Sequence, residues 1–257
     1  MSTKARLSGN SQKLAFALAV VSILSLWQGA AWLLPDFLMP DVRIVIVRLW
    51  HELQAENFRT ALWGSLARLA AGYGCAMLLG IGFGLIGAVL SFFREVLKSA
   101  IIILQSIPSI AWVPLLLILM GFGSLPIIVV VAIAAFFPAA LSVMNASESV
   151  QHVHVAAARV MGASRRDLLK RVYLPAVMPE LITGAQLAFG NAWRALISAE
   201  MLVGFGKGLG RSLSYAGETA DMVGVMTSIL AIAILAPVID QLLLESVKRR
   251  VLRYKYV

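Results

Sequence analysis

The stretch SAIIILQSIPSIAWVPLLLILMGFGSLPIIVVVAIAAFFPAALSVMNAS (residues 99–147) contains no Asp, Glu, Lys or Arg over 49 residues. About 20 apolar residues in a helix are enough to cross the hydrocarbon core of a bilayer. The stretch is therefore about twice as long as one span needs to be. It is interrupted by Gly121–Pro126 (GFGSLP), and clustered glycine and proline are typical of a break between helices. The stretch predicts two membrane-spanning helices joined by a short turn.

Four further apolar tracts raise the expected number of spans to about six. Leu14–Leu34, Leu69–Phe93 and Met222–Ile239 carry no charge, and Leu181–Ala199 contains one charged residue, Arg194. The chain is 60% hydrophobic and 14% charged, with a mean hydropathy of +0.86. A soluble core of 257 residues does not need that much apolar surface. We therefore predict an all-α, polytopic membrane protein.

The basic residues predict the orientation of these spans. If alternate loops share a side, fifteen Lys and Arg residues lie on the side of the two termini and five on the other. An excess of this kind marks the cytoplasmic side, so both termini are expected in the cytoplasm. The net charge of +9 is then explained by contacts with anionic lipid headgroups. A nucleic-acid partner is not expected, because the basic residues form no single patch.

The spans and loops divide the chain into four parts. Residues 1–13 are expected to form a cytoplasmic N-terminal segment, and residues 14–60 the first span and an outer interfacial helix near Trp50. Residues 61–247 would form the membrane core, and residues 248–257 a basic cytoplasmic tail. The first apolar run is interpreted as a span, because the apolar core of a secretory signal has only about 7–15 residues.

The segment VAAARVMGASRRDLLKRVYLP (Val155–Pro175) lies between the fourth and fifth spans, on the predicted cytoplasmic side. Gly162 can close a short helix, and Ser164 with Asp167 gives the capping pattern of a second one. The apolar residues of the first helix share one stripe: Val155, Ala157, Val160 and Met161. A helix–turn–helix with an exposed apolar stripe suits a groove on a soluble partner. An ordinary basic loop is the alternative.

Prolines and isolated charges in the spans are candidates for a transport pathway. Pro108 and Pro114 favour a kink in the third span, which would line a pathway or be purely structural. Arg194 and Glu200 lie in or near the fifth span, where a charge at mid-bilayer costs about 2.5–3.5 kcal/mol. Arg194 would either attract an anionic solute or pair with Glu200, and we favour the pair.

Catalytic motifs are absent from the sequence. The segment GFGKGLG (Gly204–Gly210) superficially resembles a phosphate-binding loop, but Lys207 is followed by glycine and not by Ser or Thr. This segment is also expected outside the membrane, as a flexible turn away from cytoplasmic ATP. The three histidines pair with no obvious nucleophile, and no Cys/His cluster has metal-ligand spacing. We therefore expect no ATPase site, no enzymatic activity, no cofactor and no metal.

The segment Ala157–Ser164, with the later Leu174-Pro175, is similar to the coupling loop of ABC-importer permeases, in which Glu-Ala-Ala, three residues and Gly precede Leu-Pro. Other stretches resemble permeases of the nitrate, sulfonate and taurine branch: Ser65–Gly72, Pro108–Leu115, Phe136–Pro138, Ala199–Leu202 and Gly208–Gly210. The resemblance extends in order from about Thr60 to the C-terminus.

This resemblance implies a permease subunit of an ATP-driven importer in the bacterial inner membrane. Two ATPase subunits would dock on the coupling loops, a second permease subunit would complete the pathway as a homodimer or similar pair, and an external solute-binding protein would deliver the solute. The docking residues would be Ala156, Ala157, Ala158, Arg159, Gly162, Ala163, Ser164, Leu174 and Pro175. The glutamate of the family falls at Ala156, so one polar docking contact is missing.

The branch implies that the solute is a small anion such as a sulfonate, taurine or nitrate. An ATPase-independent secondary transporter is the alternative, but it would need ion-coupling residues within its spans, and acids there are nearly absent. An integral membrane enzyme would need a cluster of polar residues near one interface, which the sequence does not contain.

Overall fold

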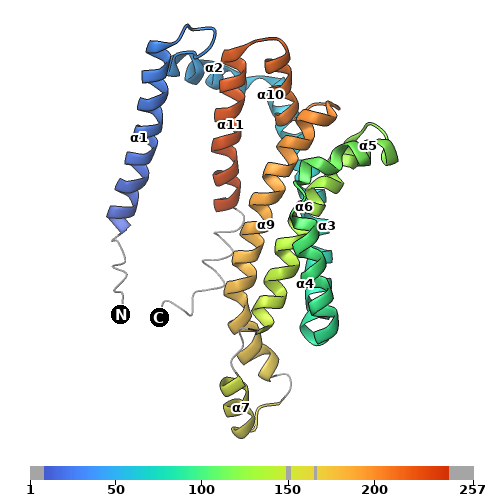
Figure 1. The fold of residues 1–257 in the computed structure, drawn as a ribbon. Coiled ribbons are helices and arrows are strands. Elements are labelled where there is room, and N and C mark those ends of the chain that lie inside the picture. The colour runs from blue at the N-terminus through green and yellow to red at the C-terminus, as the bar shows by residue number, and fades with distance from the viewer. Residues whose placement is uncertain (1–8, 149–151, 165–166, 243–257) are drawn as a thin grey trace.

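The computed structural model describes residues 9–148, 152–164 and 167–242, and these residues contain helices and connections but no strand (Figure 1). The all-α prediction is confirmed. The helices are α1 (Gly9–Leu33), α2 (Val42–Gln54), α3 (Glu56–Val89), α4 (Ser91–Gln105), α5 (Val113–Met120), α6 (Ser124–Glu148), α7 (His152–Val160), α9 (Leu174–Val203), α10 (Leu209–Glu218) and α11 (Met222–Asp240). A 3-10 turn covers Ser109–Trp112, and a π-helical segment covers Leu168–Tyr173.

Several of these helices are long and apolar enough to cross a membrane. In the part of the chain that the structure describes, α1, α3, α6 and α11 meet this condition, and the bent pair of α4 and α5 would make a fifth span. The remaining predicted span falls in α9, which has 30 residues but carries Gln186, Asn191 and Arg194 along its middle. The multi-pass architecture is thus confirmed, and the sixth crossing stays a prediction.

The predicted third span is sharply bent. Helix α4 ends at Gln105, and the helical stretch that begins at Ser109 runs at 87° to it. Pro108 directly precedes the 3-10 turn, and Pro114 lies in the first turn of α5. A residue before proline is driven out of the helical conformation, so α4 ends just before Pro108. The prediction of a kink at these prolines is confirmed.

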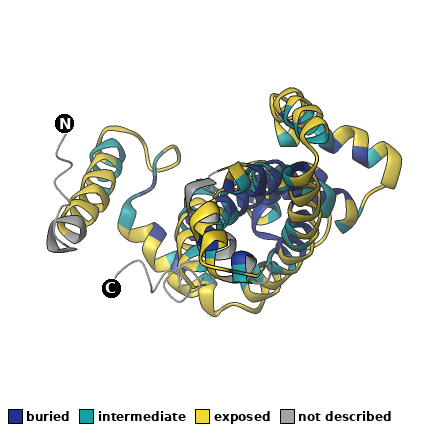
Figure 2. Cartoon of the chain, turned by 90° about the horizontal axis from the view of Figure 1, so that it is seen from below, coloured by how far each residue is buried: buried dark blue, intermediate teal, exposed yellow. Residues whose placement is uncertain are grey.

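Helices α3, α6 and α9 pack together and supply most of the buried core. A Cβ atom added at Gly80 of α3 would lie 2.7 Å from the Cβ of Ala139 in α6. Gly184 of α9 likewise lies directly against Ser142 of α6. Figure 2 shows the buried residues gathered at the centre of this bundle. Small residues therefore let the helix backbones approach closely, as is usual in membrane proteins.

The segments expected on opposite sides of the membrane lie at opposite ends of the molecule. Helices α2 and α10 lie at one end and α7 at the other (Figure 1). Helix α2 confirms the predicted short helix around Trp50, which is exposed. Helix α1 stands apart from the bundle and is held near α2 by a hydrogen bond from Trp27 Nε1 to the carbonyl of Pro40 (3.0 Å). The predicted basic tail and most of the first segment, residues 1–8, lie outside the described residues.

Candidate functional site

Helix α7 ends at Val160, and Gly162 closes it with a turn, as the sequence predicts. Gly162 has a φ of +80°, in the left-handed region where a Cβ atom would be strained. The N–H of Ala163 donates to the carbonyl of Ala158 (3.0 Å), and the N–H of Gly162 donates to that of Arg159 (2.9 Å). These two bonds are the Schellman pattern, which satisfies the last carbonyls of a helix. The turn at Gly162 thus fixes the direction in which the chain leaves α7.

The predicted cap of the following helix is also confirmed. The N–H of Asp167 donates to Ser164 Oγ (3.2 Å), while the Ser164 backbone N–H (3.3 Å) and hydroxyl (2.6 Å) donate to Asp167 Oδ2. The hydrogen bonds from Ser164 hold the pKa of the Asp167 carboxyl below its usual value. This reciprocal pattern is a capping box, and it joins α7 to the next helix in a defined geometry.

The next helix continues directly into the membrane core. Helix α9 contains the apolar tract Leu181–Ala199 and begins before it, at Leu174, so that Pro175 and Pro179 lie within the helix. The π-helical turns of Leu168–Tyr173 lie directly before α9. A continuous helical path, Leu168–Val203, therefore leads to the core from the turn around Gly162 (residues 160–164, called the α7 turn below).

The outer surface of the α7 turn is apolar. Val160 and Met161 are 89% and 80% exposed, and Ala157 is exposed as well. On the inner side, Ala158 is buried against Leu168. Ala156 and Arg159 are exposed, whereas the side chains of Val155, Leu174 and Pro175 are not described. The turn borders a cavity of about 500 Å³, which is lined by Ala158, Met161, Gly162, Ala163, Asp167, Arg171 and Val172.

A buried ion pair lies near the opposite end of the bundle. Arg68 of α3 and Glu200 of α9 are 9% and 1% exposed, and their Nη1 and Oε1 atoms are 2.7 Å apart. The Ser65 hydroxyl lies 2.8 Å from both carboxylate oxygens, and the N–H of Gly210 donates to Oε2 (2.9 Å). These donors replace the hydrogen bonds to water that the Glu200 carboxylate loses when it is buried.

The predicted pairing of Arg194 with Glu200 was therefore wrong. Arg194 donates instead to Asn191 Oδ1. Neighbours on a helix surface are three or four residues apart, and Arg194 is six residues before Glu200, so the two side chains leave α9 in different directions. The sequence did not indicate Arg68 as the partner of Glu200, because the two residues lie 132 positions apart.

The glycine-rich segment Gly204–Gly210 closes over this ion pair. Arg68 Nη1 donates to the carbonyl of Lys207 (3.1 Å), and the N–H of Leu209 donates to Ser65 Oγ (2.9 Å). A Cβ atom at Gly208 would lie 2.6 Å from the Glu200 carboxylate. We expected this segment to be a flexible turn, and that was wrong. Arg68, Ser65 and Glu200 bind the polar groups of its backbone and hold it in place.

The four candidate pathway residues do not meet in one site. Glu200 lies in the buried ion pair, and Pro108 and Pro114 are exposed at the bend between α4 and α5. Arg194 lies on the exposed face of α9, where it borders a cavity of about 380 Å³ between α9 and α11. This cavity is lined by Thr183, Gln186, Leu187, Phe189, Gly190, Trp193, Arg194, Ala236, Pro237 and Asp240.

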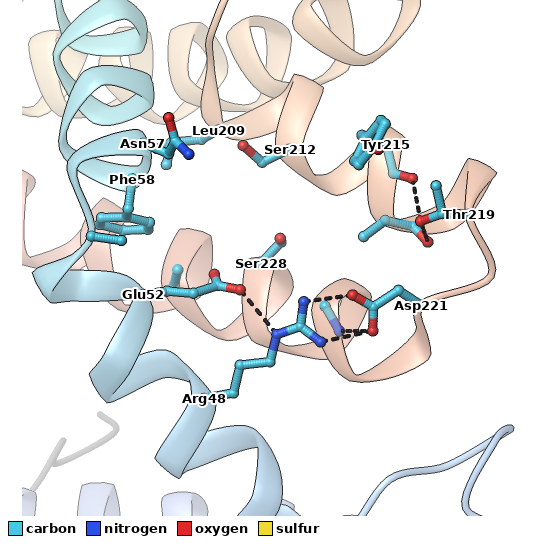
Figure 3. Close-up of a pocket in the computed structure, with 14 residues that line it drawn as sticks. Arg48, Glu52, Asn57, Phe58, Leu209, Ser212, Tyr215, Thr219, Asp221 and Ser228 are labelled. Carbon is cyan, nitrogen blue, oxygen red and sulfur yellow. Dashed lines mark hydrogen bonds and ion pairs between the residues drawn. The ribbon is translucent and has the colours of Figure 1, made fainter.

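A further cavity, of about 340 Å³, lies among α2, α3, α10 and α11 (Figure 3). Arg48 crosses it and donates to Glu52 Oε1 (3.0 Å) and, through Nη1, to Asp221 Oδ1 (2.8 Å). Asp221 also accepts from the N–H of Gly224 and so caps α11. The ion pair lowers the pKa of Asp221 and raises that of Arg48. The sequence analysis did not identify this ion pair, because Arg48 and Asp221 lie 173 positions apart.

Comparison with known proteins agrees with this architecture. Residues 80–252 match the family described as "Binding-protein-dependent transport system inner membrane component". The chain belongs to this family. It is therefore a multi-pass inner-membrane protein of a transport system, as the resemblance in the sequence implied.

Two relatives agree with the predicted branch of this permease family. The chain is 32% identical to the taurine transport system permease protein TauC of Escherichia coli (strain K12) over 235 residues, which cover 89% of this chain and 85% of TauC. It is 26% identical to the putative aliphatic sulfonates transport permease protein SsuC of Bacillus subtilis (strain 168), over 91% of this chain and 84% of SsuC.

A solved structure has the same fold. The inward-facing methionine ABC transporter MetNI contains a chain that superposes with a TM-score of 0.61 and 22% sequence identity. The match covers 76% of this chain and 96% of that chain. At this identity the likeness shows the fold alone, and it confirms an ABC-permease architecture for the helices described above.

Proposed function

We propose that this chain is the transmembrane permease subunit of an ATP-driven importer that moves a small solute across the inner membrane. The observation that carries the proposal is the α7 turn. Its exposed Val160 and Met161 form an apolar corner that the Schellman turn at Gly162 holds in place. An exposed apolar corner of this kind suits insertion into a groove on a soluble partner.

The partner of this corner would be the ATPase of the importer, with two ATPase subunits in each complex. Movement of the ATPase would reach the core through Leu168–Tyr173 and α9, because these segments form one helical path. A second permease subunit, most simply an identical one, would complete the pathway. Rigid-body rotation of the two permease subunits would then expose the pathway to one side at a time.

Ala156 changes the expected docking contact. It stands where the family has a glutamate, and it is exposed. Docking of the ATPase would therefore depend more on apolar contacts at Val160 and Met161. The remaining polar docking groups would be Arg159 and the capping pair of Ser164 and Asp167.

The opposite end of the molecule would receive the external solute-binding protein. Helices α2 and α10 lie at that end, as does the segment Gly204–Gly210 (Figure 1). The ion pairs Arg48–Asp221 and Arg68–Glu200 hold these elements to α11, α3 and α9. Contact with the binding protein would thus be transmitted to the core helices without a flexible joint.

The solute would be a small anion such as a sulfonate, taurine or nitrate. Arg194 supports this class, because it borders a cavity and its described hydrogen bond is to a neutral amide. The alternative of a secondary transporter needs a free acid within the spans to couple an ion. Glu200 is a poor candidate for that role, since Arg68 neutralises it.

The proposal is tested by purifying the chain from native membranes in mild detergent, with mass spectrometry of what stays bound. We expect an ABC ATPase in an amount equal to that of the permease. A stable oligomer without an ATPase, in several detergents, would favour the secondary transporter instead.

A further inference from the structure

We infer that the cavity between α9 and α11 binds a solute that carries both an anionic and a cationic group. Arg194 would bind the anionic group and Asp240 the cationic group. The inference rests on the proposed function and narrows its solute from small anions in general to small organic zwitterions.

The two charged side chains reach the cavity from different helices. Arg194 comes from the exposed face of α9, and Asp240 is the last residue of α11. No ion pair joins them within the described residues. Opposite charges therefore border one cavity without neutralising each other.

Each charge also lacks a charged partner elsewhere in the described part of the chain. The guanidinium of Arg194 donates to Asn191 Oδ1, a neutral acceptor. Asp240 Oδ1 has almost no accessible surface and, among the described residues, no hydrogen-bond partner. The Asp240 carboxylate, which borders the cavity, thus carries a charge that no described ion pair neutralises, and a cationic group in the cavity would compensate it.

A zwitterion fits this arrangement better than a simple anion. The planar guanidinium of Arg194 matches a sulfonate or carboxylate, which it can bind through two parallel hydrogen bonds. An ammonium group has three N–H donors and a positive charge, which suit the Asp240 carboxylate at the wall of the cavity. An inorganic anion would bind Arg194 but would be repelled by Asp240.

The walls of the cavity suit an organic molecule. Phe189, Trp193 and Pro237 give it an apolar lining, while Thr183 and Gln186 offer neutral hydrogen-bonding groups. Its volume of about 380 Å³ is at the lower end of the usual range for small-molecule sites. The cavity therefore has room for a solute with a few carbon atoms between its two charged groups.

The test measures binding to the purified permease with its bound ATPase, reconstituted in lipid nanodiscs. The probes are two matched pairs: taurine with isethionate, and β-alanine with 3-hydroxypropionate. Within each pair the ammonium group is replaced by a hydroxyl, and the anionic group is kept. We expect each zwitterion to bind about tenfold more tightly than its partner, as one charge-assisted hydrogen bond provides.

Variants assign the two roles. Asp240→Asn should abolish the preference within each pair, and Asp240→Glu should keep it. Arg194→Gln should weaken binding of all four probes. Glu95→Gln, which removes an exposed carboxylate on α4 outside the cavity, is the matched control and should change nothing.

Two results would overturn the inference. The first is equal binding of the zwitterion and its hydroxyl analogue in both pairs, or no binding of either zwitterion. The second is an Asp240→Asn variant that still prefers the zwitterion. The amount of bound ATPase is measured in the same preparations. If ATPase is absent from the wild-type complex, the proposed function fails. If ATPase is present and the zwitterion preference is missing, only the zwitterion site fails.

Discussion

The Nη1 atom of Arg68 lies 2.7 Å from the Oε1 atom of Glu200, although 132 residues separate them in the sequence. This pair joins α3 to the end of α9, and the segment Gly204–Gly210 closes over it. Helix α10 begins within that segment, so the position of α10 depends on the pair. The pair thereby links the core helices to the end of the molecule at which we expect the solute-binding protein.

Removing the charge of Glu200 should destabilise the protein strongly. Glu200→Gln leaves the Arg68 guanidinium buried without a counter-charge, which typically costs about 3–5 kcal/mol. The free energy of unfolding in detergent, measured by denaturant titration, would report this loss. Glu95→Gln serves as the control, because Glu95 is exposed. A Glu200→Gln protein as stable as the wild type would show that the ion pair contributes little.

Replacing both partners should be milder than replacing one. In the double variant Arg68→Met, Glu200→Gln no unpaired charge is left at this site, so part of the lost stability should return. The double-mutant cycle measures the coupling between the two side chains. Additive losses in the cycle would contradict a direct interaction.

Two glycines of α10 offer a matched comparison for the close contact with α9. A Cβ atom at Gly210 would lie 2.8 Å from the Glu200 Cβ and would also clash with the carbonyl of Ile197. At Gly217 such a Cβ would meet nothing within 4 Å apart from its chain neighbours and the backbone of its own helix. We therefore expect Gly210→Ala to lower the melting temperature, with a cost of about 1–3 kcal/mol.

Gly217→Ala should leave stability unchanged or raise it by up to about 1 kcal/mol, because alanine favours the helix. Thermal unfolding of both variants in the same detergent checks this difference. If the two variants melted alike, α10 would not be packed against α9 as described.

Much of the fold could be predicted from the sequence, because local runs of apolar residues indicate the membrane spans. The break at Gly121–Pro126, the kink at Pro108 and the turn at Gly162 were all visible, since proline and glycine act on the backbone near them. The capping box of Ser164 and Asp167 was visible for the same reason. Local signals therefore located the α7 turn correctly.

Interactions between distant segments could not be predicted in this way. Glu200 was assigned to Arg194 because both lie in one span, whereas its partner Arg68 lies in another. The glycines of Gly204–Gly210 were interpreted as flexible, although close contact with Glu200 requires small residues there. No pattern in one sequence shows which of two distant helices faces a given side chain, so the buried network was missed.

The ion pair between Arg48 and Asp221 should depend on pH. The Arg48 guanidinium lowers the pKa of Asp221 in the folded protein below the value of 3.8 expected in the unfolded chain. Its stabilising contribution is thus fully present above about pH 4 and is lost as the pH falls through the folded pKa. Both side chains are about one-third exposed, so we expect a contribution of up to about 1 kcal/mol.

Asp221→Asn provides the measurement for this pair. Asparagine also caps helices, so the variant keeps the cap of α11 and removes only the charge. The wild type should melt at a higher temperature than Asp221→Asn at pH 7, and the difference should shrink below pH 4. A difference that stayed constant down to pH 3 would show that the charge of Asp221 is not responsible.

Gly162→Asp should weaken the association with the ATPase while the protein still inserts into the membrane. An L-residue at a φ of +80° costs roughly 1–2 kcal/mol, and the strain falls on the turn that directs Val160 and Met161. Co-purification of ATPase per permease, compared with the amount of permease in the membrane fraction, measures the effect. Gly123→Asp is the control, because Gly123 lies in a turn near the other end and has ample space. Normal ATPase recovery with Gly162→Asp would remove the α7 turn from the docking site.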